Sequence, residues 1–240
     1  LSIRRQRQMC IRDRNILESH EKMLEELKTP EIIIGNIRLA MSSSVCNRYF
    51  KDDFLKFRKQ FPDIHLIVLE SGTEQMFDML RKNEVDLIFT LDSHIYDSEF
   101  IICAEHKEEV HFIAAADHPL LQRNELLLKE ICSEDFVLTE SNMSYRKLLN
   151  HELATQSLEI LPILEIGNPL QICSLIENSK MISFLPDFIT EDAYRNGYIK
   201  HLPIADCDVS VWTQLLIHKN KWRSPALNAF IDFYREVIGK

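Results

Sequence analysis

The hydrophobic positions along the chain change period repeatedly, and these changes predict alternating strands and helices from residue 37 onward. The first such elements are expected at residues 37–42, 45–60, 65–71, 73–83 and 85–91. The first, third and fifth are short apolar runs typical of buried strands, while the other two repeat their apolar side chains at helical spacing. Continuous apolar strands separated by helices indicate a parallel sheet. A longer strand is expected to follow over residues 108–120.

The same alternation then begins again. Its expected elements cover residues 126–132, 135–141, 144–155, 160–166, 168–178, 181–186, 187–195 and 198–204. A long strand over 209–219 comes next, and a helix over 224–238 closes the chain, with Ser224 at its N-cap and Pro225 at its first position. Two α/β units, each followed by a long strand, predict two lobes between which the chain crosses twice.

A separate helix is predicted before the first strand, over residues 14–28. Ile16, His20, Met23 and Leu27 repeat at heptad spacing and form a narrow, mostly apolar stripe. Such a seam favours packing against a copy of itself, which predicts an oligomer. The alternative is a surface helix that lies on its own domain.

Charge and composition describe an ordinary water-soluble protein of one large domain or two lobes. The net charge is −9 and is unevenly distributed: residues 1–14 hold five arginines and one aspartate and carry +4, which leaves −13 on the rest. A chain this acidic is not expected to bind nucleic acid over most of its surface. It has no apolar run long enough to span a membrane and no secretory signal, so we expect no membrane partner.

Cysteine spacing indicates neither disulfides nor metal ligands. The six cysteines are scattered, without a Cys-x-x-Cys pair or a Cys/His cluster. We therefore expect a reducing cytoplasmic location, no metal and no cofactor. The chain also lacks the Gly-x-Ser-x-Gly, His-Glu-x-x-His and glycine-rich phosphate-binding motifs, and its histidines are dispersed, so no catalytic residue is predicted.

Hydroxyl and amide side chains gather where expected strands run into helices. These joints are Ser42-Ser43-Ser44, Thr90-Leu91-Asp92, Thr139-Glu140-Ser141-Asn142 and Gly167-Asn168. In open α/β sheets, ligands bind beyond the carboxyl ends of the strands, where helix N-termini favour an anion. Arg146 follows one of the joints and is placed to hold a carboxylate or sulfate. The alternatives are simple helix capping for the joints and a surface salt bridge for Arg146.

In the order of its pieces, the chain from residue 14 onward resembles the C-terminal part of a LysR-type transcriptional regulator. The matching pieces include "GNIRLAMSSS", "FLKFRKQFPDIHLIVLESGTEQMFDMLRKNEVDLIFT", "FIAAADHPL", "LTESNMSYRKLL", "ISFLP" and "NGYIKHLPI". The resemblance implies a two-lobed fold of the type 2 periplasmic-binding-protein class with two crossover strands, near 114–117 and 212–215. It also implies a linker helix over 14–30.

The lobes implied by the resemblance are residues 35–114 with 215–240, and residues 115–214. A small-molecule effector is then expected between them, near Ser42, Ser44, Thr90, Thr139, Ser141, Asn168 and Leu185, with Ser43 and Arg146 alongside. The family's winged helix-turn-helix has no counterpart here, so DNA binding is expected only through that missing domain. Residues 1–13 match no part of the family and resemble translated sequencing-adapter sequence; a basic arm that touches DNA is the alternative.

Two other classes of protein share this scaffold. A solute-binding protein of a transporter needs export, which the absent signal and the 14–28 helix argue against. An enzyme such as a deaminase or dehydratase needs acid and base groups in the cleft, and hydroxyls with one arginine are a poor set for that chemistry.

Overall fold

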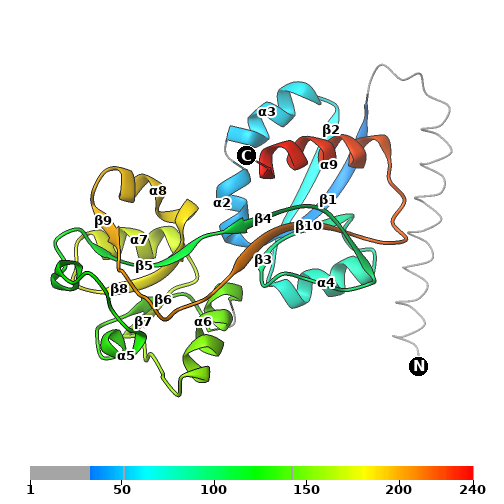
Figure 1. Ribbon diagram of the computed structural model, residues 1–240. Helices are drawn as coiled ribbons and strands as arrows, with labels where there is room; N and C mark the ends of the chain where they lie inside the picture. The colour runs from blue at the N-terminus through cyan, green and yellow to red at the C-terminus, as the bar shows by residue number, and fades with distance from the viewer. Residues whose placement is uncertain (1–32, 51, 142, 240) are drawn as a thin grey trace.

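The computed structural model describes residues 33–50, 52–141 and 143–239. The non-matching segment 1–13 and the linker helix expected over 14–30 lie outside these residues. Figure 1 shows two α/β lobes side by side, joined by the segments that lead from β4 to β5 and from β9 to β10. The structure thus confirms the expected two-lobed fold with two crossing segments.

The first lobe is built on a five-stranded sheet in the order β2-β1-β3-β10-β4. Its strands are β1 (Gly35–Met41), β2 (Ile64–Glu70), β3 (Leu87–Asp92), β4 (Phe100–Glu108) and β10 (Val211–His218). β1 pairs in parallel with both β2 and β3, as the apolar runs predicted, while β10 is antiparallel to β3 and β4. The chain therefore returns to the first lobe through β10, which lies between β3 and the edge strand β4.

Helices cover both faces of this sheet. They are α2 (Ser43–Tyr49), α3 (Asp52–Gln60), α4 (Thr73–Arg81) and α9 (Pro225–Ile238). α4 buries Met76 and Leu80 against one face of the sheet, in a cluster with Ile88 and Leu216. α2, α3 and α9 cover the other face, where Phe57 is fully buried. The first lobe is thus a three-layer sandwich.

The second lobe contains a three-stranded sheet in the order β8-β5-β9 and a short parallel pair, β6-β7. Its elements are β5 (Val110–Ala115), a 3-10 turn (Pro119–Gln122), α5 (Leu128–Ile131), β6 (Val137–Leu138), α6 (Ser144–Thr155), β7 (Leu164–Glu165), α7 (Pro169–Glu177), β8 (Ile182–Pro186), α8 (Asp187–Arg195) and β9 (Ile199–His201). β5 is antiparallel to both of its neighbours.

The chain changes sheet between Glu108 and Val110 on the way out, and between His201 and Val211 on the way back. The crossovers expected near 114–117 and 212–215 therefore fall elsewhere: the first lies at the end of β5 and the second lies inside β10. The first change of sheet falls at Glu109, inside the strand expected over 108–120, so the sequence pattern did not mark where the sheets divide.

Three local predictions differ from the structure. The helix expected over 45–60 is two helices, because the backbone turns at Phe50 (φ −105°, ψ 32°) and its ring stacks on Phe54 and Tyr234. Strand β4 was missed because exposed and buried positions mix along it without regular alternation. The strands expected around β6 and β7 are also shorter than predicted, with only two residues paired in each.

Candidate functional site

The serine triplet lies where β1 meets α2, and its three hydroxyls are used differently. Ser42 caps α2, and its Oγ accepts a hydrogen bond from the Val45 amide at 3.4 Å. Ser43 Oγ donates to Glu70 Oε2 at 2.5 Å. Ser44 is only 1% exposed, and its hydroxyl has no hydrogen-bond partner among the described residues. Ser44 is therefore the serine whose hydrogen-bonding capacity is unused.

Thr139 and Tyr145 belong to the second lobe, yet they lie beside Ser44. Both are 1% exposed, and neither hydroxyl has a partner within the described part of the chain. Burial raises the pKa of Tyr145 to about 12, and the nearby hydroxyls of Thr139 and Ser44 act in the opposite direction. The hydroxyls of Thr139 and Ser44 thus both lie near that of Tyr145 without forming hydrogen bonds of ordinary geometry. We call these three hydroxyls the hydroxyl cluster.

Arg146 follows Tyr145 in the first turn of α6 and is 4% exposed. Its Nε and Nη1 have no acceptor, and it forms no ion pair with any residue that the structure describes. Burial lowers the pKa of the guanidinium, which the charge of Glu165 partly offsets. The surface salt bridge considered as an alternative for Arg146 is therefore not what the structure shows.

The other predicted residues serve the fold or lie at the margin. Thr90 is fully buried, and its Oγ1 donates to the Gln214 carbonyl oxygen at 3.3 Å. Asn168 caps α7 by accepting from the Leu170 amide at 3.0 Å, and Ser141 is exposed. Leu185 is buried in β8. Capping therefore accounts for Ser42 and Asn168, while Ser44, Thr139 and Arg146 are left without described partners.

Sequence reasoning missed Tyr145. A tyrosine between a serine and an arginine at the start of a helix is typical of a core residue, and the Tyr145 ring is buried in the core. A tyrosine hydroxyl this deeply buried usually finds a partner. The clue available in the sequence was its position within the joint that follows Thr139.

Packing and ion pairs join the two lobes around this site. α6 of the second lobe contacts β3 of the first. Lys147 Nζ, on α6, lies 2.9 Å from Glu74 Oε1 on α4. Arg48, on α2, lies 3.7 Å from Glu191 on α8 and over the ring of Phe188. Because exposed ion pairs contribute about 1 kcal/mol or less, the two ion pairs can open at little cost.

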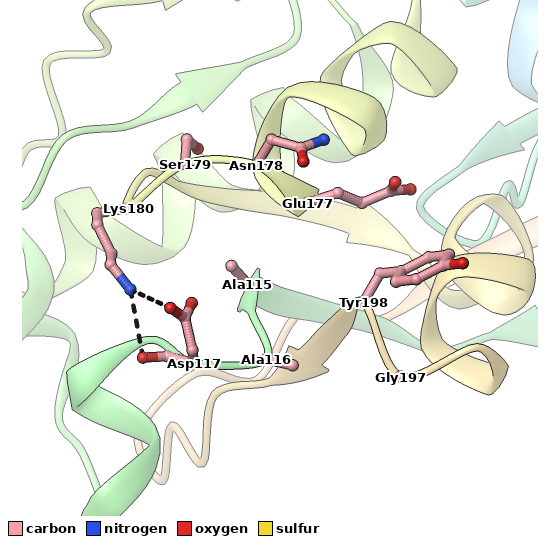
Figure 2. A pocket seen from close by; sticks show the side chains of 9 residues that line it. All are labelled: Ala115, Ala116, Asp117, Glu177, Asn178, Ser179, Lys180, Gly197 and Tyr198. Carbon is pink, nitrogen blue, oxygen red and sulfur yellow. Dashed lines mark hydrogen bonds and ion pairs between the residues drawn. The ribbon is translucent and has the colours of Figure 1, made fainter.

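A concavity lies in the second lobe alone, between the end of β5 and the turn after α7. Its volume is about 490 Å³, and Figure 2 shows the Lys180 amine paired with Asp117 at its rim, while Tyr198 closes another side. Its polar groups are largely exposed, and the charge of Lys180 is compensated by Asp117. It lacks the buried unpartnered groups that mark the hydroxyl cluster.

Comparison with known proteins agrees with this architecture. The family model described as the LysR substrate-binding domain matches residues 33–239. An uncharacterised HTH-type transcriptional regulator of Bacillus subtilis, YwqM, is 30% identical over 211 residues, covering 85% of this chain and 69% of its own length.

Solved structures give the same result. The QuiR effector-binding domain in complex with shikimate superposes with a TM-score of 0.69 at 19% identity, covering 86% of this chain and 98% of that one. The BenM effector-binding domain with benzoate gives 0.66 at 17% identity, covering 85% and 92%.

The fold is therefore the two-lobed fold of the type 2 periplasmic-binding class, and the family that matches is one of regulators and not of enzymes. The chain belongs to the LysR family of transcriptional regulators, and residues 33–239 form its substrate-binding (effector-sensing) domain. Among the described residues, no helix has both the length and the hydrophobicity needed to cross a bilayer.

Proposed function

We propose that this domain senses a small anion held between the lobes by Ser44, Thr139, Tyr145 and Arg146. The supporting observation is that these four side chains, drawn from both lobes, are at least 96% buried and have unpartnered polar atoms among the described residues. Their chemistry is that of an anion site, with three hydroxyl donors and one guanidinium. A carboxylate or sulfate group suits this set.

The energetics favour a ligand with strong acceptors. A buried polar group without a partner costs about 1–3 kcal/mol, and more when it is charged. An anion that accepts from Arg146 and the hydroxyl cluster removes several of these costs at once. A ligand shifts a conformational equilibrium only by its difference in affinity between the two states. Contacts contributed by both lobes exist only when the lobes are together, so binding favours the closed pose.

Ligand entry then requires the lobes to separate, because the hydroxyl cluster is almost inaccessible. The crossing segments at Glu109 and 202–210 serve as the hinge, and the weak pairs Lys147–Glu74 and Arg48–Glu191 close on the opposite lobe. Ser42, Ser43, Thr90, Ser141, Asn168 and Leu185 form the outer boundary of the proposed site. We take the first lobe as residues 35–108 with 211–239 and the second as residues 110–201, which moves the expected boundaries at 114 and 215 to the crossing segments.

The chemistry of the ligands bound to related domains supports this proposal. QuiR was solved with shikimate and BenM with benzoate, and both ligands carry one carboxylate on a six-membered ring. We infer a ligand of the same size class, with one acidic group directed at Arg146.

In the full-length regulator, we propose that lobe closure changes the angle between subunits and so the position of DNA-binding domains outside this chain, in the cytoplasm. Homo-oligomerisation through the predicted 14–30 helix is part of this proposal. The edge strand β2 exposes Ile67 and Leu69, which is consistent with a further contact between subunits.

The test is a thermal-shift panel of benzoate, shikimate, other aromatic acids, sulfate and sulfur-containing acids, followed by calorimetry on any acid that raises the melting temperature. Ser44→Ala and Thr139→Val are expected to weaken that acid about tenfold each, the loss of one hydrogen bond to a charged group. Thr155→Val removes an exposed hydroxyl bonded to its own helix and is the control. Unchanged affinity in both site variants rejects the proposed site.

A further inference from the structure

Three side chains with metal-binding atoms converge on one face of the second lobe. His111 lies on β5, Asp187 is the first residue of α8, and His201 ends β9. His111 is paired with Leu185 on β8, and His201 is paired with Ile113 on β5. Because residues two apart on a strand share a face, both histidines project from the same side of the sheet. Asp187 follows Leu185 by two residues and reaches that side from the start of α8.

The potential ligand atoms are already close together. His111 Nδ1 lies 2.7 Å from Asp187 Oδ1, and His201 Nε2 lies 3.7 Å from the same oxygen. One ligand atom from each of the three residues fits within 4.8 Å of the others. In a tetrahedral Zn²⁺ site with bonds of about 2.1 Å, neighbouring ligand atoms are about 3.4 Å apart. Shifts of about 1 Å or less at each side chain therefore reach that spacing.

The hydrogen bonds of these three side chains do not occupy all of their potential metal-binding atoms. His201 Nε2 is buried and has no hydrogen-bond partner among the described residues. The two imidazole rings stack with centroids 4.2 Å apart, and Tyr194 lies against His201 on another side at 4.5 Å. For both nitrogen lone pairs to face one ion, the rings must rotate out of this stack. All three side chains are partly exposed, so an ion can reach them without unfolding the lobe.

The surrounding charge is mixed. Glu108, Glu109 and Glu191 line the same concavity as Asp187 and His201. Glu191 is paired with Arg195 at 2.5 Å and with Arg48 at 3.7 Å, so its charge is largely compensated. Asp187 is consequently the carboxylate best placed to bind an ion, with two neutral imidazoles completing the set.

We propose that His111, Asp187 and His201 form a binding site for one divalent transition-metal ion of the zinc type. Two imidazoles and one carboxylate are a common ligand set for such ions, and a fourth position is left for water. The hard ions Mg²⁺ and Ca²⁺ prefer oxygen ligands and are disfavoured here. This site shares no residue with the hydroxyl cluster and does not depend on the proposed effector.

The test is calorimetric titration of the chelator-treated chain with Zn²⁺, and with Mg²⁺ for comparison. One Zn²⁺ per chain is expected, with no heat from Mg²⁺. His201→Gln and Asp187→Asn are expected to weaken Zn²⁺ about tenfold or more, since even outer-shell changes cost 10–100-fold. His65→Gln, at an exposed position on β2, is the control and keeps wild-type affinity. Circular dichroism of each variant confirms that it is folded.

Cobalt distinguishes this site from the cysteines of the chain. Co²⁺ bound to nitrogen and oxygen gives visible d–d absorption without the near-ultraviolet charge-transfer band of a thiolate ligand. The expected result is d–d absorption that His201→Gln removes. Equal Zn²⁺ affinity in wild type, His201→Gln and Asp187→Asn, a thiolate band alone, or no binding of Zn²⁺ overturns the proposal.

Discussion

Thr213 donates a hydrogen bond of 2.7 Å from its Oγ1 to Oε1 of Glu108, joining β10 to β4 where both strands approach the second lobe. Glu108 is buried, and Tyr49 Oη on α2 also points at it, at 3.5 Å. The buried Glu108 carboxylate at the junction of the lobes thus contacts both β10 and α2, the helix that carries Ser44. This contact ties the hinge to the candidate site.

Removal of that donor is expected to destabilise the protein. Thr213→Val keeps the shape of the side chain but leaves the Glu108 carboxylate with only the long contact from Tyr49. We expect the free energy of unfolding to fall by about 1–3 kcal/mol, the cost of an unsatisfied buried acceptor. Urea unfolding measures the change. Thr155→Val, on the exposed face of α6, is the control and should stay within about 0.5 kcal/mol of wild type.

Asp86 makes the free energy of unfolding depend on pH. Its carboxylate binds the Arg38 guanidinium and amide, with Nη2 at 2.7 Å, and the Lys221 amine at 2.7 Å. Burial alone raises the pKa of Asp86, but these partners outweigh it and the pKa is lowered. Its stabilising contribution is therefore complete above the unfolded-state pKa of about 4, and is lost as pH falls through the lower folded-state value.

The corresponding experiment compares wild type with Asp86→Asn by urea unfolding between pH 7 and pH 3. At pH 7, we expect the variant to be less stable by about 3 kcal/mol, as for a broken buried ion pair. The difference should shrink as pH falls below about 4. Asp63→Asn, at an exposed position, is the matched control. A difference that stays constant over this range contradicts the assignment.

Phe57 anchors α3 and α9 on one face of the first sheet. Its ring lies 5.3 Å from the rings of both Phe230 and Phe233, in edge-on geometry, and it is fully buried. Phe57→Ala should lower the free energy of unfolding by about 3–5 kcal/mol through lost burial and a cavity. Tyr96→Ala, at a ring that is 86% exposed, should change it little. Chemical denaturation followed by tyrosine fluorescence measures both.

Much of the fold follows from patterns that are local in sequence. The parallel β1, β2 and β3 strands read as apolar runs because both faces of that sheet are covered, and α9 was visible from its cap and periodicity. Strand β4 was not visible, because its burial depends on β10, which lies about a hundred residues later. The break at Phe50 likewise depends on Tyr234, at the far end of the chain.

The sequence predicted which strand-to-helix joints contribute to the candidate site. It did not predict which of their side chains remain without hydrogen-bond partners. Strand-to-helix positions made Ser44, Thr139 and Arg146 candidates, because topology brings such joints together. Whether a hydroxyl caps its own helix or remains unpaired depends on side-chain geometry, which separates Ser42 from Ser44. His111, Asp187 and His201 are far apart in sequence and at no ligand spacing, so their convergence follows only from the pairing of β5 with β8 and β9.

The central claim is that Arg146 is kept buried for an anion and not for stability, and Arg146→Met tests it most directly. Methionine fills similar volume without a charge, so we expect the ligand-free variant to be more stable than wild type by about 1–3 kcal/mol. We also expect it to lose the rise in melting temperature that the responding acid produces in wild type. Lys129→Met, at an exposed position on α5 of the same lobe, should keep that rise. An Arg146→Met variant that is less stable than wild type and still responds to the acid contradicts the account.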